Sequence, residues 1–320
     1  MFEREDLQRV RLAAGPDPMW EMVLSLHRAR DAAQPARLAD WRRRVRRDAP
    51  RTPENQAALA NLFTLVPVTG RFPDFLTPAP LTTDWEAGCE AIASLSGRRL
   101  RTDLALAFAH REPPPWVRRL ASGDRGSVQA LSGAVQKAYD LLVAPQWPAV
   151  GTTVAHDRGE RVRLLTERGV GAMLASLPGI LGWDGRVLLT RFPESHTIHL
   201  QGRGLTVVPS YFCSGNPITF IDADLPPVLI YAAGDARRGS ATAPPEHLAA
   251  VVGRTRAACL HSLQHPATTT ELAGRLGISI GTASKQAALL RQAGLIASMR
   301  NGNAIQHALT GLGHALLHQD

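Results

Sequence analysis

Residues 268–291 read T-T-T-E-L-A-G-R-L-G-I-S-I-G-T-A-S-K-Q-A-A-L-L-R, and this stretch decides the fold of the last quarter of the chain. Thr268 and Glu271 have the spacing of a capping box, which predicts that a short helix begins there. Gly277 suits the residue after its end, and Ser279 suits the N-cap of a second helix. Two short helices joined by a tight turn that contains glycine make a helix-turn-helix.

The second helix has two different faces. Ala283, Ala287 and Leu290 fall on one side, where we expect them to pack on the first helix. Small and hydroxyl-bearing residues at its start allow a helix to enter the major groove of DNA, and Lys285 and Gln286 carry donors for base edges or phosphates. The predicted DNA-binding residues are Thr269, Thr270, Ser279, Gly281, Thr282, Ser284, Lys285, Gln286, Arg291, Arg300, Asn301 and Asn303.

A β-hairpin is expected next. Asn301-Gly302 separates two segments, I-A-S-M-R and A-I-Q-H-A-L, and is a strong signal for a type I′ turn. This hairpin forms the predicted wing, with Arg300, Asn301 and Asn303 at its tip, and Thr310 caps a last helix. Upstream, helices are expected from Leu248 to the breaker Gly253 and over 255–263.

The order and spacing of these motifs over residues 246–318 resemble ArsR-type winged-helix regulators. The S-K-Q at Ser284–Gln286 stands where such proteins often carry S-R-H or S-H-Q. The resemblance implies a winged helix-turn-helix that binds double-stranded DNA. A winged helix that serves only protein contacts is the alternative.

The charge distribution favours a polyanionic partner. The formal net charge is +8, although a bias toward arginine in a GC-rich genome would also raise it. No Asp or Glu lies between Leu272 and Gln319, whereas Arg275, Lys285, Arg291 and Arg300 all do. Such a stretch suits a surface that approaches phosphates, with chance in a small Ala/Leu-rich domain as the alternative.

The chain divides near residue 240. All aromatic residues lie at or before Tyr231, and Gly234–Pro245 is rich in breakers and small residues, as linkers are. We therefore predict an N-terminal dimerisation and effector domain over 1–240 and a DNA-binding domain over 241–320.

We expect no metal and no cofactor. Relatives of the ArsR type often sense metals, but the first helix of the motif contains no cysteine. His314 and His318 have metal-ligand spacing without a partnering carboxylate, and Cys259, His261 and His265 form only a loose cluster. The three cysteines fit no disulfide framework, and neither a signal peptide nor a membrane span is expected, so we predict a cytoplasmic protein.

Residues 1–240 predict an α+β fold in which helices lead and a mainly antiparallel β-sheet follows. Two stretches of this part resemble a domain of unassigned function that precedes the ArsR-type DNA-binding domain in regulators of high-GC bacteria. They are E-D-L-Q-R-V-R-L-A-A-G-P-D-P-M-W near the N-terminus and H-L-Q-G-R-G-L-T-V-V-P-S-Y-F further on. Helices are expected over 6–12, 18–27, 85–109, 128–143 and 161–177, and strands over 186–192, 196–200, 204–212, 218–222 and 227–231.

Residues 1–240 show no catalytic motif, so we expect no enzymatic activity. The nucleophile-elbow, Walker and dinucleotide-binding patterns are all missing, and His156-Asp157 is expected at the surface. The basic run Trp41–Arg47 is interpreted as a solvated helix face, with DNA flanks as the alternative, and Cys213 as a buried strand cysteine. Part of the aromatic content can line an apolar effector site, for which Trp85, Trp116, Trp147 and Trp183 are the candidates.

The sequence thus predicts a homodimeric transcription regulator, with repression as the expected mode and a small apolar ligand as the expected effector. The rival from another class is a small-molecule-binding protein or enzyme whose winged helix mediates assembly, and a metal sensor is a narrower rival.

Overall fold

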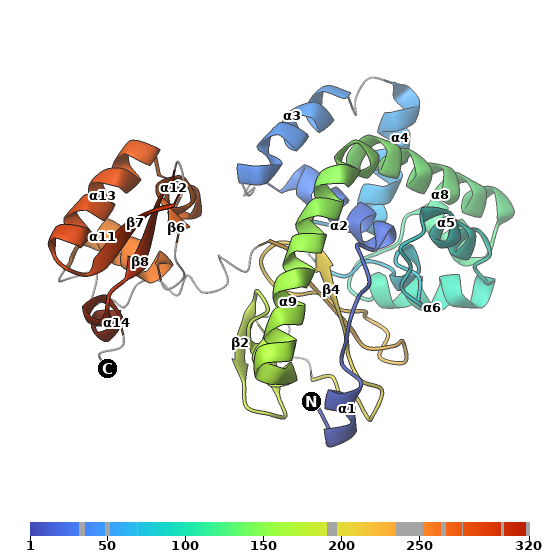
Figure 1. The fold of residues 1–320 in the computed structure, drawn as a ribbon. Helices are drawn as coiled ribbons and strands as arrows, with labels where there is room; N and C mark the ends of the chain where they lie inside the picture. The colour runs from blue at the N-terminus through green and yellow to red at the C-terminus, as the bar shows by residue number, and fades with distance from the viewer. Residues whose placement is uncertain are drawn as a thin grey trace. The chain divides into compact units, whose positions relative to one another are not determined.

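The computed structural model describes residues 1–31, 36–48, 52–68, 70–190, 197–234, 252–263, 267–276, 278–301 and 304–317. The chain forms two compact units, Met1–Gly234 and Asp235–Asp320, each of which mixes helices with small sheets (Figure 1). The division falls a few residues before the predicted boundary at 240. No helix of the described segments is long and apolar enough to cross a membrane.

The first unit is built mainly from helices, with its strands late in the sequence apart from one short early strand. The helices are α1 (Arg4–Gln8), α2 (Pro18–Arg30), α3 (Ala39–Asp48), α4 (Pro53–Leu65), α5 (Trp85–Ala93), α6 (Gly97–Ala107), α7 (Pro115–Ala121), α8 (Arg125–Ala138) and α9 (Trp147–Ala175), with short helical turns at Ala36–Leu38, Asp74–Leu76, Tyr139–Val143 and Ala144–Gln146. The strands are β1 (Arg11–Leu12), β2 (Ile180–Trp183), β3 (Leu188–Thr190), β4 (Thr206–Ser210) and β5 (Val228–Ala232).

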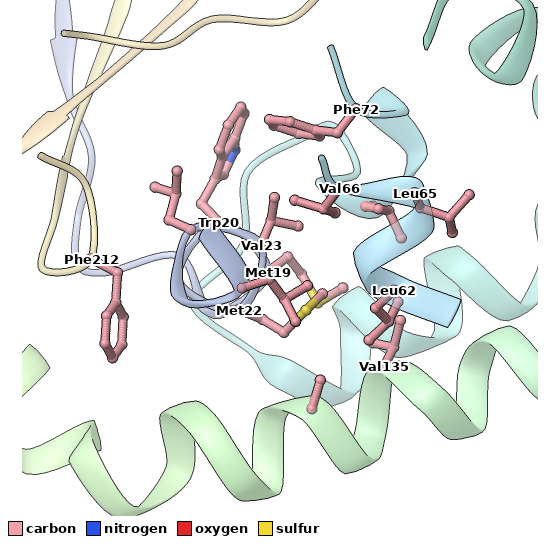
Figure 2. Packing of buried hydrophobic residues seen from close by; sticks show 14 of the residues in the cluster. Met19, Trp20, Met22, Val23, Leu62, Leu65, Val66, Phe72, Val135 and Phe212 are labelled. Carbon is pink, nitrogen blue, oxygen red and sulfur yellow. The ribbon is translucent and has the colours of Figure 1, made fainter. Parts of the chain in front are cut away.

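Helix α2 lies at the centre of the largest hydrophobic core. The carboxylate of Asp17 begins it by accepting hydrogen bonds from the amides of Met19 and Trp20, at 2.9 and 3.1 Å, and Pro18 occupies the first turn. Figure 2 shows Met19 and Met22 pointing from this helix toward Leu62 of α4, with Val135 of α8 nearby. The helix is buried over 18–26 without a polar face, as expected of a central helix rather than a surface one.

The main sheet of the first unit is parallel, so the prediction of a mainly antiparallel sheet was wrong. Strand β4 pairs in parallel with both β1 and β5, and only the small β2–β3 hairpin is antiparallel. The physical reason was visible in the sequence, because β4 and β5 are nearly continuous apolar runs rather than alternating ones. Such runs are typical of parallel strands covered on both faces.

Three predicted segments take a different conformation. Arg11 and Leu12, expected at the end of a helix, pair with Thr206 and Val207 and extend the parallel sheet. The segment 218–222 forms no strand and makes only an isolated bridge from Ile218 to Ile230, while 197–200 is irregular.

A buried ion pair within α9 is hydrogen-bonded to a tyrosine of the sheet, and α9 lies beside β4 in Figure 1. Arg161 donates to Asp157 at 3.1 Å, and the Tyr231 hydroxyl on β5 donates to the other oxygen of Asp157 at 2.5 Å. Asp157 and Arg161 are at most 2% exposed, so the expectation of a surface position for Asp157 was wrong, whereas His156 is exposed. Breaking such a pair leaves a charge without compensation, which makes this contact a fixed point of the first unit.

Glu21 makes a second buried polar connection, between α2 and the end of β4. Its carboxylate accepts hydrogen bonds from the Ser210 hydroxyl at 2.9 Å and from the Tyr211 and Phe212 amides at 2.8 and 3.0 Å. Burial raises the pKa of Glu21 to about 7, against the lowering effect of these hydrogen bonds.

This raised pKa gives a pH-dependent stability. Between pH 4.5 and about 7 the folded chain binds more protons at Glu21 than the unfolded chain, so this group stabilises the fold at low pH and loses that contribution as the pH rises. As the pH falls from 8 to 5, the wild-type chain should gain on the order of 3 kcal/mol more unfolding free energy than the Glu21→Gln variant. Urea unfolding of the first unit at several pH values measures the difference. The exposed Glu112→Gln variant should follow the wild type, and equal pH dependence in all three chains would contradict the role of Glu21.

Candidate nucleic-acid interface

The second unit contains the helices α11 (Arg254–Ser262), α12 (Thr269–Leu276), α13 (Ile280–Gln292) and α14 (Gly311–Leu317). Its three strands, β6 (Ala267–Thr268), β7 (Ile296–Asn301) and β8 (Ala304–Leu309), form an antiparallel sheet in the order β6-β8-β7 (Figure 1). The predicted upstream helix from Leu248 lies outside the described residues except for its last position.

The start of α12 has the predicted capping box. The Glu271 amide donates to the Thr268 hydroxyl at 3.2 Å, and the Thr268 amide donates to the Glu271 carboxylate at 2.9 Å. Leu272 and Ala273 turn inward and are buried. The capped end therefore sets both where α12 begins and which face it presents to the core.

Helix α13 begins at the predicted N-cap. The Ser279 hydroxyl accepts from the Thr282 amide at 3.1 Å, and the two hydroxyls of Ser279 and Thr282 lie 2.8 Å apart. Gly294, with φ of 72°, follows the end of the helix. Ala283, Ala287 and Leu290 are all buried, as predicted, and belong to the same apolar cluster as Leu272 and Ala273 of α12.

The burial of that face leaves the opposite side of α13 in solvent. Gly281, Thr282, Ser284 and Lys285 are exposed there, Arg291 is exposed one or two turns further on, and Gln286 is half-buried. The first turn of the helix also carries the positive end of its dipole and amides without helical partners. Six of the twelve predicted DNA-binding residues thus lie on α13, and a seventh, Ser279, is its N-cap.

The remaining predicted residues are distributed over α12 and the hairpin. Thr270 is exposed and Thr269 half-buried on the first turn of α12, and Arg300 is exposed on β7 opposite Ile305 of β8. Asn301 pairs with Ala304 at the end of the hairpin, whereas Gly302 and Asn303 lie outside the described residues.

A residue that the sequence reasoning missed, His307, connects these elements. Its Nδ1 lies 2.8 Å from the hydroxyl of Ser298 on β7, and its Nε2 lies 3.0 Å from the hydroxyl of Thr269 on α12. His307 is 5% exposed, and burial together with the charge of Arg291 lowers its pKa, so the ring is neutral at pH 7. The sequence offers only a weak signal for this role, namely the position of His307 within the second strand of the predicted hairpin.

The metal candidates form no site in the described part of the chain, where no group of three or more His, Cys, Asp or Glu side chains has metal-binding geometry. Cys259 is buried in the core of the second unit, and burial raises its pKa to about 11, which disfavours the thiolate that metals bind. Burial likewise lowers the pKa of His261. His265, His318 and the side chain of His314 lie outside the part of the chain that the structure describes.

The candidate residues of the first unit have structural contacts. Trp85 stacks on Tyr139 with ring centroids 3.8 Å apart, and Trp147 meets Tyr139 edge-on at 6.2 Å. Trp183 packs against Phe2 in a separate cluster, and Trp116 packs on the main core. The structure therefore brings two of the four predicted tryptophans together and leaves the other two apart.

The basic run forms most of α3, with Trp41 buried and Arg43, Arg46 and Arg47 exposed. Arg43 pairs with Asp40 and Arg47 with Asp48, which reduces the net positive charge of this face. Cys213 is buried, as predicted, but it lies in irregular backbone after β4 and not in a strand.

Comparisons with known protein families, with curated proteins and with solved structures find no match to the chain.

Replacing His307 by phenylalanine should destabilise the second unit by about 1–3 kcal/mol, because the hydroxyls of Thr269 and Ser298 lose their shared partner. The pKa of His307 is lower in the folded chain than in the unfolded chain, so below about pH 6.5 the unfolded chain binds more protons at this residue. The wild-type unit should therefore lose stability as the pH falls below about 6.5. Thermal unfolding of the full chain at pH 7.5 and 5.5 measures both effects. The exposed His110→Phe variant serves as the control, and an H307F chain as stable as the wild type at pH 7.5 would refute the bridging role.

Proposed function

We propose that the chain is a sequence-specific DNA-binding transcription regulator and that its second unit is a winged helix-turn-helix. The observation that carries the proposal is the division of α13 into two faces. Ala283, Ala287 and Leu290 are buried, while Gly281, Thr282, Ser284 and Lys285 are exposed on the other side. A recognition helix needs this combination, because one face must be held and the other must be free to enter the major groove.

The roles of the elements follow from their contacts. Helix α12 packs against the buried face of α13 and supports it, as the first helix of a helix-turn-helix does. In the groove, Lys285 and Gln286 are long enough to reach base edges, and the hydroxyls of Thr282 and Ser284 can bond to bases or phosphates. The β7–β8 hairpin is the wing and presents Arg300 to the DNA backbone.

The charge of the second unit supports a phosphate-bearing partner. Glu271 is the last acidic residue before Asp320, and one of its oxygens accepts the Thr268 amide within the capping box. Lys285, Arg291 and Arg300 are exposed along the proposed interface. An exposed cationic face attracts the DNA backbone and makes binding dependent on salt.

We further propose that the regulator acts as a homodimer and a repressor, with half-sites about one helical turn, roughly 34 Å, apart. The first unit presents exposed apolar side chains for a second copy. Val162 on α9 is 46% exposed, and Leu181 and Leu189 on the β2–β3 hairpin, which packs on α9, are 56% and 55% exposed. A second copy that covered these side chains would remove their apolar surface from water.

The test is binding to the DNA upstream of the gene that encodes the chain, measured by fluorescence anisotropy at several salt concentrations. Wild-type binding should weaken steeply with salt. The double variant Lys285→Ala/Arg300→Ala should lose on the order of 100-fold in affinity, and its salt slope should fall by about 4, because two cationic contacts are removed from each chain of the bound dimer. The stoichiometry should be two chains per site.

A matched control removes the same charge from the first unit. In Arg98→Ala/Arg118→Ala two exposed arginines of the first unit, on α6 and α7, are lost. This variant should bind DNA within a few fold of the wild type. Salt-independent binding, or equal losses in the two double variants, would contradict the proposed interface and favour a winged helix used for protein assembly.

A further inference from the structure

Helix α2 carries a buried hydrogen-bond donor without an acceptor. Trp20 is 1% exposed, and within the part of the chain that the structure describes its indole Nε1 has no hydrogen-bond partner. Leaving a buried polar group of this kind unpaired is unfavourable, and most buried donors in proteins are paired. The unpaired indole N–H is therefore a donor that an acceptor on a bound molecule would satisfy.

Two turns further along the same helix, His27 has an unpaired atom of the opposite kind. Its Nε2 is buried without a partner among the described residues, while the ring donates a hydrogen bond to the backbone of Val68. Burial, followed by the charges of Arg28 and Arg30, lowers the pKa of His27 to about 4, so the ring is neutral at pH 7. A neutral ring that donates through one nitrogen offers the other as an acceptor.

Aromatic rings lie around both atoms. The Phe72 ring contacts Trp20 and His27, with centroids at 6.1 and 5.8 Å, and Phe220 lies 5.4 Å from Trp20. Figure 2 shows Phe72 directly beside the Trp20 indole. The ring of Phe72 thus packs against both residues that carry an unpaired polar atom and has no hydrogen-bonding group of its own.

The segments that carry the two phenylalanines are held together beside α2. The Asp74 carboxylate accepts from the Ile221 and Asp222 amides at 2.8–3.0 Å, so the residues after Phe72 are tied to those after Phe220. Phe72 itself lies in irregular backbone between Gly70 and Asp74, where a side chain moves without breaking a helix or strand. Phe72 is therefore an aromatic neighbour of Trp20 whose own backbone is held by neither a helix nor a strand.

We propose that Trp20, His27, Phe72 and Phe220 form a binding site for a small, uncharged, planar molecule that accepts a hydrogen bond from Trp20 and donates one to His27. The molecule takes the place of the Phe72 ring against the Trp20 edge. The two polar residues are seven positions apart on α2, roughly 10 Å along the axis, which is a length that two fused or linked rings span. The binding site is independent of DNA binding, whereas its role as an effector site rests on the proposed function.

The probe is 2-naphthol, a planar and uncharged molecule whose single hydroxyl tests the contact with Trp20, with naphthalene as the comparison that lacks the polar group. Titration calorimetry on the full chain should show tighter binding of naphthol than of naphthalene. Trp20→Phe should weaken naphthol binding by at least tenfold and remove its advantage over naphthalene. Trp183→Phe, in a separate cluster, is the matched control and should leave both affinities unchanged.

The Phe72→Ala variant should change naphthol affinity in the opposite direction to Trp20→Phe. It should strengthen naphthol binding by at least tenfold, because the displaced ring is already gone, whereas damage to the fold would weaken it. Where Trp20→Phe does not fold, the wild-type indole N–H resonance of Trp20, identified with the other Trp→Phe variants, should move downfield on addition of naphthol.

Absence of naphthol binding to the wild-type chain, or binding that leaves the Trp20 resonance in place, would overturn the site. Anisotropy with DNA, measured separately, distinguishes a failed binding site from a failed DNA-binding proposal. Naphthol that binds but leaves DNA affinity unchanged would overturn the effector role.

Discussion

The arrangement of the second unit depends on one constraint, the burial of Ala283, Ala287 and Leu290 against α12. These side chains recur at helical spacing, so burying them fixes the rotation of α13 about its axis. The exposed position of Gly281, Thr282, Ser284 and Lys285 then follows without further contacts. The two small alanines also let α12 and α13 approach closely, so that a short pair of helices buries enough apolar surface to hold the proposed reading face in one orientation.

The hairpin is positioned relative to α12 by polar contacts rather than by apolar packing alone. His307 joins Ser298 on β7 with Thr269 at the start of α12, and Thr310 donates to the Gly294 carbonyl that follows α13. These hydrogen bonds connect the strands with the beginning of one helix and the end of the other. In the proposed function, the wing and the recognition helix therefore meet the DNA as one rigid body.

Local signals in the sequence predicted much of the second unit, because its helix ends are set by neighbouring residues. The Thr268–Glu271 capping box, the Ser279 N-cap and Gly294 all act within a few positions of themselves, and the structure contains each of them. The apolar runs of β4 and β5 indicate a parallel pair, but no local pattern identifies the third strand, in which Arg11–Leu12 pairs with Thr206 and Val207 almost two hundred residues away. His307 was missed for the same reason, since its partners come from two other elements, and the buried position of Asp157 depends on Tyr231 of a distant strand.

The central claim is that the exposed face of α13 and the β7–β8 hairpin meet DNA. Hydrogen–deuterium exchange of the full chain, measured with and without a bound duplex, tests it most directly because it reports on every segment at once. The account predicts that added protection is concentrated in Ile280–Gln292 and in the strands Ile296–Asn301 and Ala304–Leu309. Protection confined to the first unit, or no change in these three segments while DNA is bound, would contradict it.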